Sequence, residues 1–460
     1  MENLTFVEIV EAVHGKIIKE GKEVTYESVS TDTRTIKENS IFIALKGEKF
    51  NGNDYAAEAS IKGARLCIVD ELKCSLEDFS NNTFVVKVQD GKKALLDLSK
   101  YYRSKLNLKV VGITGSTGKT STKDLVAAVL SSKYKVFKTK GNFNNEIGLP
   151  LMVFNLDNSY DVAVLEMGMS SLGEIHRLAE VARPDIAIIT NIGVSHIEYL
   201  KTRENILKAK LEITDFFNKE NSLIINADND LLKRVGSSNY KVVRVGMEEK
   251  HLDLKAVEIY LGEDCSKFRV SSNYEETSSE FFINVPGKHN ISNSLLAIAC
   301  GKILGLSYQE MIEGIKNLEF TSMRLDILRG KKFTIIDDSY NASPDSMKAA
   351  IDVLCNMNGN KKIAVLGTMK ELGDKSSELH REVAEYASFR NIDELIVVGE
   401  YAEVFSRGFN NDKKFKAFSS NDEAVQYINT IINKDDVVLV KASRSMKFET
   451  IVKELKIINY

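Results

Sequence analysis

The chain of 460 residues is too long for one ordinary hydrophobic core, and its length predicts about three domains. Hydrophobic residues make up 43% and charged residues 28%, a balance that is typical of a globular protein and excludes a largely disordered chain. With 62 basic and 65 acidic residues the net charge is −3, and no long basic run indicates a nucleic-acid-binding surface.

The N-terminal segment has acidic residues where a secretory signal needs a basic start, and no apolar run reaches the roughly 18 residues of a membrane span. We therefore expect a cytoplasmic protein without membrane insertion. The five cysteines lie far apart and lack metal-ligand spacing, which favours reduced thiols over a disulfide framework. They are Cys67, Cys74, Cys265, Cys300 and Cys355.

Short elements of both kinds alternate in the first part of the chain. The hydrophobic spacing predicts a helix from Phe6 to Val13, a strand from Ile41 to Leu45, a helix beginning at Asp54 and a strand from Leu66 to Val69. We interpret residues 1–106 as a small α/β domain.

A helix over Lys92–Lys105 ends just before an apolar strand, Leu108–Thr114, and we place the first domain boundary there. Apolar strands then alternate with helical segments, which predicts a mostly parallel sheet covered by helices. These strands are Val162–Glu166, Ile186–Asn191 and Leu223–Asn226. Residues 107–322 form the predicted middle domain.

A second alternating series follows Arg324. Its predicted strands are Phe333–Asp338, Ile363–Leu366, Leu395–Val398 and Val437–Val440. The pattern predicts a doubly wound, Rossmann-like domain over residues 323–460, with ligands at the carboxyl ends of its strands. The predicted fold class is therefore α/β with three domains.

The segment GITGSTGKTSTK (Gly112–Lys123) lies between an apolar strand and a helix, where backbone N–H groups and the helix dipole can converge on phosphate. Lys119 would reach the terminal phosphates and Thr120 would hold Mg²⁺. The strict motif has a glycine five residues before Gly118, where Ile113 stands. A glycine-rich turn without a ligand is the alternative, but the lysine and hydroxyls favour ATP. The predicted ATP contacts are Gly115, Ser116, Thr117, Gly118, Lys119, Thr120 and Ser121.

TGSTGKTST resembles the phosphate loop of the Mur ligase and folylpolyglutamate synthase family, whose glycine spacing is shorter than the strict motif. The resemblance covers essentially the whole chain. Five segments are most similar to the members that add D-alanyl-D-alanine: STDTR, IFIALKGEKFNGNDY, GNFNNEIGLP, EMGMSSLGEI and IIDDSYNASPDSM. The substrate contacts that the resemblance implies are Ser30, Thr31, Asp32, Arg34, Asn142, Asn144, Asn145 and Ser170.

Glu166 and His196 each follow an apolar strand, so both should lie at the sheet edge that carries the phosphate loop. A surface carboxylate at a strand end is the alternative for Glu166. Mg²⁺ prefers oxygen ligands, and His196 enters the metal set only through the resemblance. The resemblance also implies that Lys210 is carbamylated and binds a second Mg²⁺, whereas Lys208 on the same helix is interpreted as solvated.

The segment GKHNISNSLLAIA resembles the family's linker to the adenine site and implies contacts from His289, Asn290 and Asn293. An ordinary capped helix is the alternative. Arg324 lies at a domain boundary, where a cation could neutralise the transferring phosphate on closure. Asp338 and Asn341 are implied as contacts of the ribose and the bound nucleotide. Thr368 and Ala442 depart from the family, which usually has aspartate and glycine there.

The resemblance implies an ATP- and Mg²⁺-dependent amide ligase. The carboxylate of a UDP-muramoyl tripeptide would attack the γ-phosphate, and the amine of D-alanyl-D-alanine would attack the resulting acyl phosphate. The implied catalytic residues are Lys119, Glu166, His196, Lys210 and Arg324. We expect a monomer.

Three other functions stay open. A sister ligase would add a single amino acid, or glutamate to folate. A phosphate-loop kinase or motor-type ATPase would explain the glycine-rich loop but not the N-terminal segments. A nucleotide-sensing scaffold without activity would not need Lys119, Glu166, His196 and Arg324 together. The third residue of the peptide could be lysine or diaminopimelate.

Overall fold

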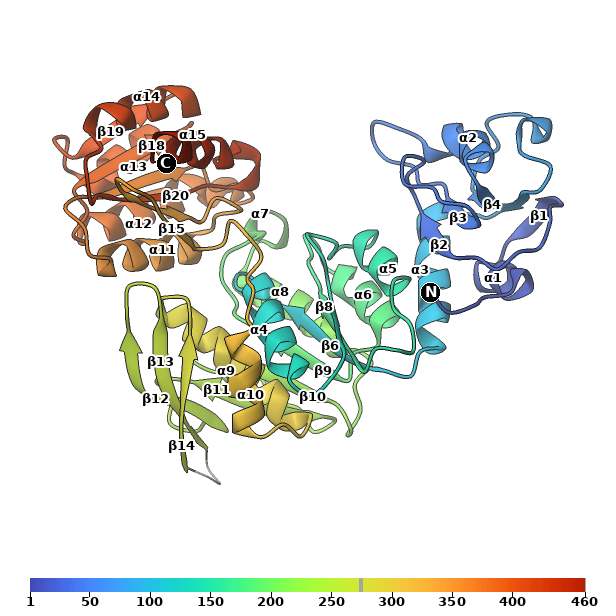
Figure 1. The fold of residues 1–460 in the computed structure, drawn as a ribbon, viewed down its shortest axis with the longest axis horizontal. Coiled ribbons are helices and arrows are strands. Elements are labelled where there is room, and N and C mark those ends of the chain that lie inside the picture. The colour runs from blue at the N-terminus through green and yellow to red at the C-terminus, as the bar shows by residue number, and fades with distance from the viewer. Residues whose placement is uncertain (273–275, 460) are drawn as a thin grey trace.

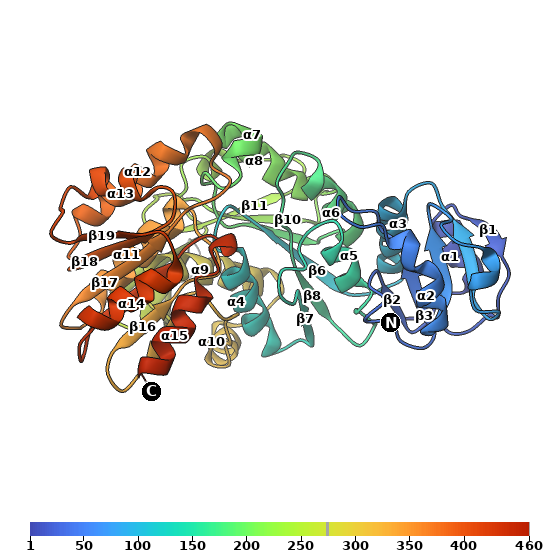
Figure 2. The same ribbon diagram turned by 90° about the horizontal axis from the view of Figure 1, so that it is seen from above.

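Three sheets organise the computed structural model, which describes residues 1–272 and 276–459. The first and last sheets lie at opposite ends of the molecule, and the largest sheet lies between them (Figures 1 and 2). The α/β class with three sheet-containing domains is confirmed. No helix in these two ranges is long and apolar enough to span a membrane.

The N-terminal sheet has five strands in the order β1-β5-β4-β3-β2. Only β1 is antiparallel to its neighbour, and the other pairs are parallel. The strands are β1 (Lys16–Lys19), β2 (Ser28–Ser30), β3 (Ser40–Ile43), β4 (Ala64–Val69) and β5 (Phe84–Lys87). The helices are α1 (Phe6–Ala12), α2 (Ala56–Ile61) and α3 (Gly91–Ser104). Helix α3 carries the chain into the middle domain and packs on its helices α5 and α6.

The middle sheet has nine strands in the order β14-β13-β12-β11-β10-β9-β6-β8-β7. The pairs from β7 to β12 are parallel, and β13 and β14 add an antiparallel extension. The strands are β6 (Lys109–Thr114), β7 (Val136–Lys138), β8 (Val162–Glu166), β9 (Ile186–Ile189), β10 (Ser222–Asn226), β11 (Lys241–Gly246), β12 (Leu254–Leu261), β13 (Ser266–Ser272) and β14 (Glu276–Ile283).

Helices cover both faces of this sheet because alternate residues of its central strands are apolar on both sides. Val111 and Ile113 of β6 face the helices α4, α9 and α10, whereas Val110 and the alternate residues of β8 and β9 join the core formed by α5, α6 and α8. The helices are α4 (Lys119–Ser131), α5 (Gly148–Val153), α6 (Glu174–Ala182), α7 (Ile197–Leu200), α8 (Arg203–Leu211), α9 (Lys288–Ile303) and α10 (Tyr308–Lys316).

The C-terminal sheet has six strands in the order β15-β16-β20-β17-β18-β19. All pairs are parallel except β15 with β16. The strands are β15 (Asp326–Arg329), β16 (Thr334–Asp337), β17 (Lys362–Gly367), β18 (Glu394–Val398), β19 (Phe415–Phe418) and β20 (Val437–Lys441). Helices α11 (Pro344–Asn356), α12 (Ser376–Ser388) and α13 (Ala402–Phe409) share one core, and α14 (Asn421–Ile431) and α15 (Glu449–Asn459) cover the other face.

The predicted buried strands are present, with ends that shift by one or two residues. The helix expected from Asp54 begins as a 3-10 turn, Gly52–Tyr55, before α2. The strands that were not predicted are β1, β2, β5, β7, β11 to β15 and β19. Most of them are short or half-exposed and lack the continuous apolar run of a buried strand. The domain boundaries at 106/107 and 322/323 stay predictions.

Candidate functional site

A cleft with a cavity volume of about 620 Å³ lies between the middle and C-terminal domains. The middle domain contributes the phosphate loop, the ends of β8 and β9, and the start of α9. The C-terminal domain contributes the segments that follow β16, β17 and β20. The cleft therefore lies at the carboxyl ends of parallel strands in both sheets, where α/β proteins bind their ligands.

Hydrogen bonds hold the phosphate loop open in front of α4. The backbone N–H groups of Ser116 and Thr117 donate to Asn191, at 3.0 Å and 2.8 Å. Gly118 has φ +79° and begins the helix, and the ammonium of Lys119 donates to the carbonyl of Gly115 at 2.8 Å. Desolvation lowers the pKa of Lys119, and the nearby Arg324 cation acts in the same direction. Those two N–H groups are occupied, so the donors that remain for phosphate are the N–H groups at the start of α4 and the ammonium of Lys119.

Both the backbone conformation at position 115 and the lack of room for a side chain require glycine there. Its φ is +152°, and a Cβ atom there would lie 1.8 Å from Oγ1 of Thr190. We expect Gly115→Ala to lower the free energy of unfolding by about 2–4 kcal/mol and to weaken ATP binding. The matched control is Gly305→Ala, because Gly305 also has a positive φ, +76°, but no described atom lies within 4 Å of its added Cβ. Equal losses in the two variants, measured by chemical denaturation, would contradict the steric explanation.

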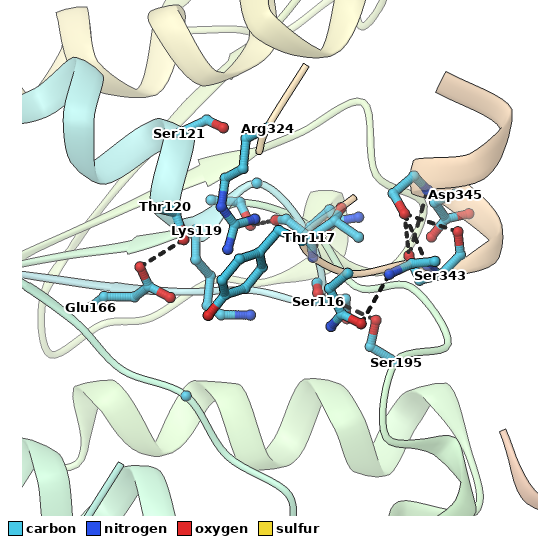
Figure 3. A pocket seen from close by; sticks show the side chains of 18 of the residues that line it. Ser116, Thr117, Lys119, Thr120, Ser121, Glu166, Ser195, Arg324, Ser343 and Asp345 are labelled. Atoms are coloured by element: carbon cyan, nitrogen blue, oxygen red, sulfur yellow. Dashed lines mark hydrogen bonds between the residues drawn. The ribbon is translucent and has the colours of Figure 1, made fainter. Parts of the chain in front are cut away.

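The carboxylate of Glu166 lies beside the phosphate-loop hydroxyl. Oγ1 of Thr120 donates to Oε2 of Glu166 at 2.9 Å (Figure 3). The amide of Asn144 donates to Oε1 at 2.8 Å. Within the described ranges no group of three or more His, Cys, Asp or Glu side chains could hold a metal. A hydroxyl and a carboxylate fit Mg²⁺, which usually takes few protein ligands and completes its shell with phosphate oxygens and water.

His196 and Glu371 meet across the domain boundary. Nδ1 of His196 lies 2.6 Å from Oε2 of Glu371, close enough for an ion pair although not aligned as a hydrogen bond. The contact with His196 lowers the pKa of Glu371. Both residues have positive φ, +65° and +63°, a strained state that is common at functional sites. Sequence reasoning missed Glu371, because only the approach of the C-terminal domain brings it to the site.

Lys210 is 1% exposed within α8 and does not line the cleft. Desolvation lowers its pKa well below the ordinary value of 10.5, and the Lys119 cation lowers it further. Lys208 on the same helix is exposed. Of the two lysines, only Lys210 is thus in surroundings that favour a neutral amine.

Arg324 enters the cleft from the link between the middle and C-terminal domains. Its neighbours Met323 and Leu325 both have positive φ, +62° and +59°. The guanidinium carbon of Arg324 lies 4.2 Å from the ring centroid of Tyr340, and its Nε is buried without a hydrogen-bond partner among the described residues. Asp338 forms an ion pair with Lys441, which also donates to the carbonyl of Asn341 at 2.9 Å. Lys441 is a second cleft residue that sequence reasoning missed.

The three residues expected to contact the adenine differ in what surrounds them. The amide of Asn290 donates to the carbonyl of Pro286 at 2.8 Å, so this side chain has a structural partner already. Asn293 lies against Gly118, and His289 lines the cleft with its pKa lowered by desolvation. The capped-helix alternative is wrong, because the N-cap of α9 is Gly287 and no side chain caps the helix.

The expected substrate contacts fall into two places. Four of them line the cleft: Asn142, Asn144, Asn145 and Ser170. The other four lie in the N-terminal domain, where Ser30 ends β2 and Thr31, Asp32 and Arg34 follow it. There Asp32 and Arg34 form an exposed ion pair at 2.6 Å, and the N–H of Asp32 donates to Oγ of Ser30 at 3.1 Å. A ligand that touches both places must extend across two domains.

Comparisons with known proteins match this architecture. The chain matches the Mur ligase family catalytic domain at residues 25–103, the Mur ligase middle domain at 113–301 and the Mur ligase, glutamate ligase domain at 323–444. It is 38% identical to the UDP-N-acetylmuramoyl-tripeptide–D-alanyl-D-alanine ligase of Bacillus subtilis (strain 168), over 98% of each chain. The Escherichia coli (strain K12) enzyme of that name is 32% identical, over 99% of each chain.

Two solved structures are also similar to this chain over nearly its full length. A crystal structure of MurF from Acinetobacter baumannii has a TM-score of 0.90 and 29% identity, covering 99% of each chain. A structure of MurF ligase from Thermotoga maritima in complex with ADP has a TM-score of 0.83 and 29% identity, covering 94% of this chain and 98% of that one.

Proposed function

The chain belongs to the Mur ligase family, and on that premise we propose that it joins D-alanyl-D-alanine to UDP-N-acetylmuramoyl-tripeptide while converting ATP to ADP and phosphate. The main support is the similarity to ligases of that specificity over 98% of the chain. The cleft adds a second support, because it places a phosphate loop opposite side chains of another domain.

The geometry suggests how the chain would promote the reaction. Amide formation needs an activated carboxylate, so the tripeptide carboxylate attacks the γ-phosphorus and ADP leaves. The N–H groups at the start of α4 and Lys119 hold the phosphates, and Arg324 offsets the charge that spreads over the transferring group. The amine of D-alanyl-D-alanine then attacks the acyl carbon, and phosphate leaves. Positioning of the two substrates supplies much of the acceleration.

Mg²⁺ would be held by Thr120 and Glu166, whose oxygens already lie 2.9 Å apart, with His196 and a carbamylated Lys210 as the further ligands of the proposed set. When bound, the ion neutralises phosphate charge. Asn144 orients the carboxylate of Glu166 by its hydrogen bond of 2.8 Å.

The remaining roles divide between the domains. Asp338, Asn341, Asn290 and Asn293 would contact the nucleotide from the rim of the cleft. Ser30, Thr31, Asp32 and Arg34 would bind the uridine diphosphate, and Asn142, Asn145 and Ser170 would contact the peptide. One chain supplies the whole cleft, so we propose that the enzyme acts as a monomer.

We expect phosphate release from ATP to require both UDP-muramoyl tripeptide and D-alanyl-D-alanine. The measurement is a coupled phosphate assay with a panel of muramoyl peptides and amine acceptors, including free D-alanine, L-lysine and glutamate with folate. Equal activity with a single amino acid would indicate a sister ligase. Phosphate release without any muramoyl peptide would indicate a kinase or motor-type ATPase instead.

A further inference from the structure

Five carboxylates line the cleft, and four of them have partners. Glu166 accepts from Thr120 and Asn144, and Asp338 pairs with Lys441. Glu371 contacts His196, and Glu174 accepts from the backbone of Ser170 and the hydroxyl of Ser171. The fifth, Asp345, makes no hydrogen bond or ion pair with any residue in the two described ranges. It is the free anion of the cleft.

Asp345 reaches the cleft from the first turn of α11 in the C-terminal domain. A Cβ atom on Gly193 would lie 2.2 Å from Oδ2 of Asp345 and 3.5 Å from Cβ of Ser116, so the carboxylate lies against the middle domain beside the phosphate loop. Figure 3 shows Asp345 on the side of the loop opposite to Glu166. The carboxylate therefore lies away from the proposed Mg²⁺ ligands Thr120 and Glu166.

Charged groups of both signs surround Asp345. Lys348 and Arg203 favour its anion, whereas Glu382 and Asp230 oppose it, and Lys348 and Arg203 are themselves paired with Glu382 and Asp230. Desolvation is the largest influence and raises the pKa of Asp345. The residue is nevertheless exposed in the cleft, so its unpaired carboxylate is open to a positively charged ligand.

The reaction brings few cations to the cleft: Mg²⁺, whose proposed ligands Thr120 and Glu166 lie on the other side of the loop, the side-chain ammonium of a lysine or diaminopimelate in the tripeptide, and the α-ammonium of the dipeptide. The phosphates, the tripeptide carboxylate and the acyl phosphate are anionic, and the carboxylate of the dipeptide is also negative. The α-ammonium of D-alanyl-D-alanine is the cation that must come close to the acyl phosphate. It must also lose a proton before its nitrogen can attack.

We propose that Asp345 binds the α-ammonium of the incoming dipeptide and accepts one of its protons, an inference that rests on the proposed ligase function. The N–H bond breaks and the proton passes to Oδ of Asp345, which leaves a neutral amine. Its lone pair forms the C–N bond as the acyl C–O bond to phosphate breaks. The second proton leaves with phosphate as HPO₄²⁻, and Asp345 returns its proton to solvent.

Asp345→Asn keeps the shape of the side chain and removes its charge. We expect KM for D-alanyl-D-alanine to rise about tenfold to a hundredfold, as for loss of a charged hydrogen bond. Formation of the acyl phosphate from tripeptide and ATP, measured by borohydride trapping without dipeptide, stays within twofold of the unsubstituted enzyme. Asp422→Asn, on the exposed first turn of α14, is the control and changes neither quantity.

A second measurement separates recognition of the ammonium from a general loss of structure. D-lactoyl-D-alanine, which has a hydroxyl in place of the amine, competes with the dipeptide. The unsubstituted enzyme should bind it far more weakly than D-alanyl-D-alanine, and Asp345→Asn should reduce that discrimination about tenfold. Unchanged KM and unchanged discrimination in a variant that still forms the acyl phosphate would overturn the assignment. If the unsubstituted enzyme does not use D-alanyl-D-alanine, the proposed function itself fails.

Discussion

Lys119→Ala should lower phosphate release at least about a thousandfold while leaving the fold intact. The ammonium of Lys119 is held at the phosphate loop by the carbonyl of Gly115 at 2.8 Å, so it is placed before the nucleotide arrives. Alanine removes this positive charge without disturbing the loop, whose N–H groups bond to Asn191. Phosphate release under saturating tripeptide, dipeptide and ATP measures the effect, and circular dichroism checks the fold.

Lys133→Ala is the control for loss of one lysine, because Lys133 is exposed just after α4 and bonds to the carbonyl of Gly305. It should retain full activity. Substantial turnover by a folded Lys119→Ala enzyme would refute the role of the loop in phosphate transfer.

Lys210→Ala should also lower activity at least about a hundredfold, and formate or acetate should restore part of it. Carbon dioxide reacts with a neutral amine, and the lowered pKa of Lys210 increases the neutral fraction at neutral pH. Carbamylation would convert this amine, close to Lys119, into an anionic oxygen ligand. A short carboxylate can occupy the vacated ligand position in the alanine variant.

Exposed Lys208, two residues earlier on α8, is the matched control: Lys208→Ala should keep its activity and should not respond to formate. Incorporation of ¹³C-labelled carbon dioxide, followed by NMR, gives a readout that does not depend on turnover. A folded, inactive Lys210→Ala enzyme that no short acid rescues would show that Lys210 acts as a direct phosphate or carboxylate contact.

The sequence predicted the parts of the site that are local in the chain. The phosphate loop, Thr120 and the strand that ends at Glu166 lie within short segments, and continuous apolar runs located most of the buried parallel strands. The half-exposed strands β12 to β14 carry no comparable signal, so the antiparallel extension of the middle sheet was not found.

The opposite wall of the cleft could not be predicted in the same way. Glu371 contacts His196 only when the C-terminal domain lies against the middle domain. Lys441 pairs with Asp338 within the C-terminal domain, but the two residues lie far apart in the sequence. Asp345 lies in the segment IIDDSYNASPDSM, whose resemblance was noted in the sequence. Its lack of a partner depends on the folded arrangement of the chain, which the sequence does not show. Asn290 is the opposite case. It lies in a segment whose resemblance implied an adenine contact, but its side-chain amide donates to the carbonyl of Pro286, just before α9.

Identification of the reaction product by mass spectrometry tests the proposed ligase function most directly. The enzyme is incubated with ATP, Mg²⁺, UDP-N-acetylmuramoyl-tripeptide and D-alanyl-D-alanine. The product should be the tripeptide plus the dipeptide less one water, formed in equal amount to ADP. A product extended by one amino acid, or ADP formation without any extended peptide, would contradict the assignment of this chain as a ligase of D-alanyl-D-alanine.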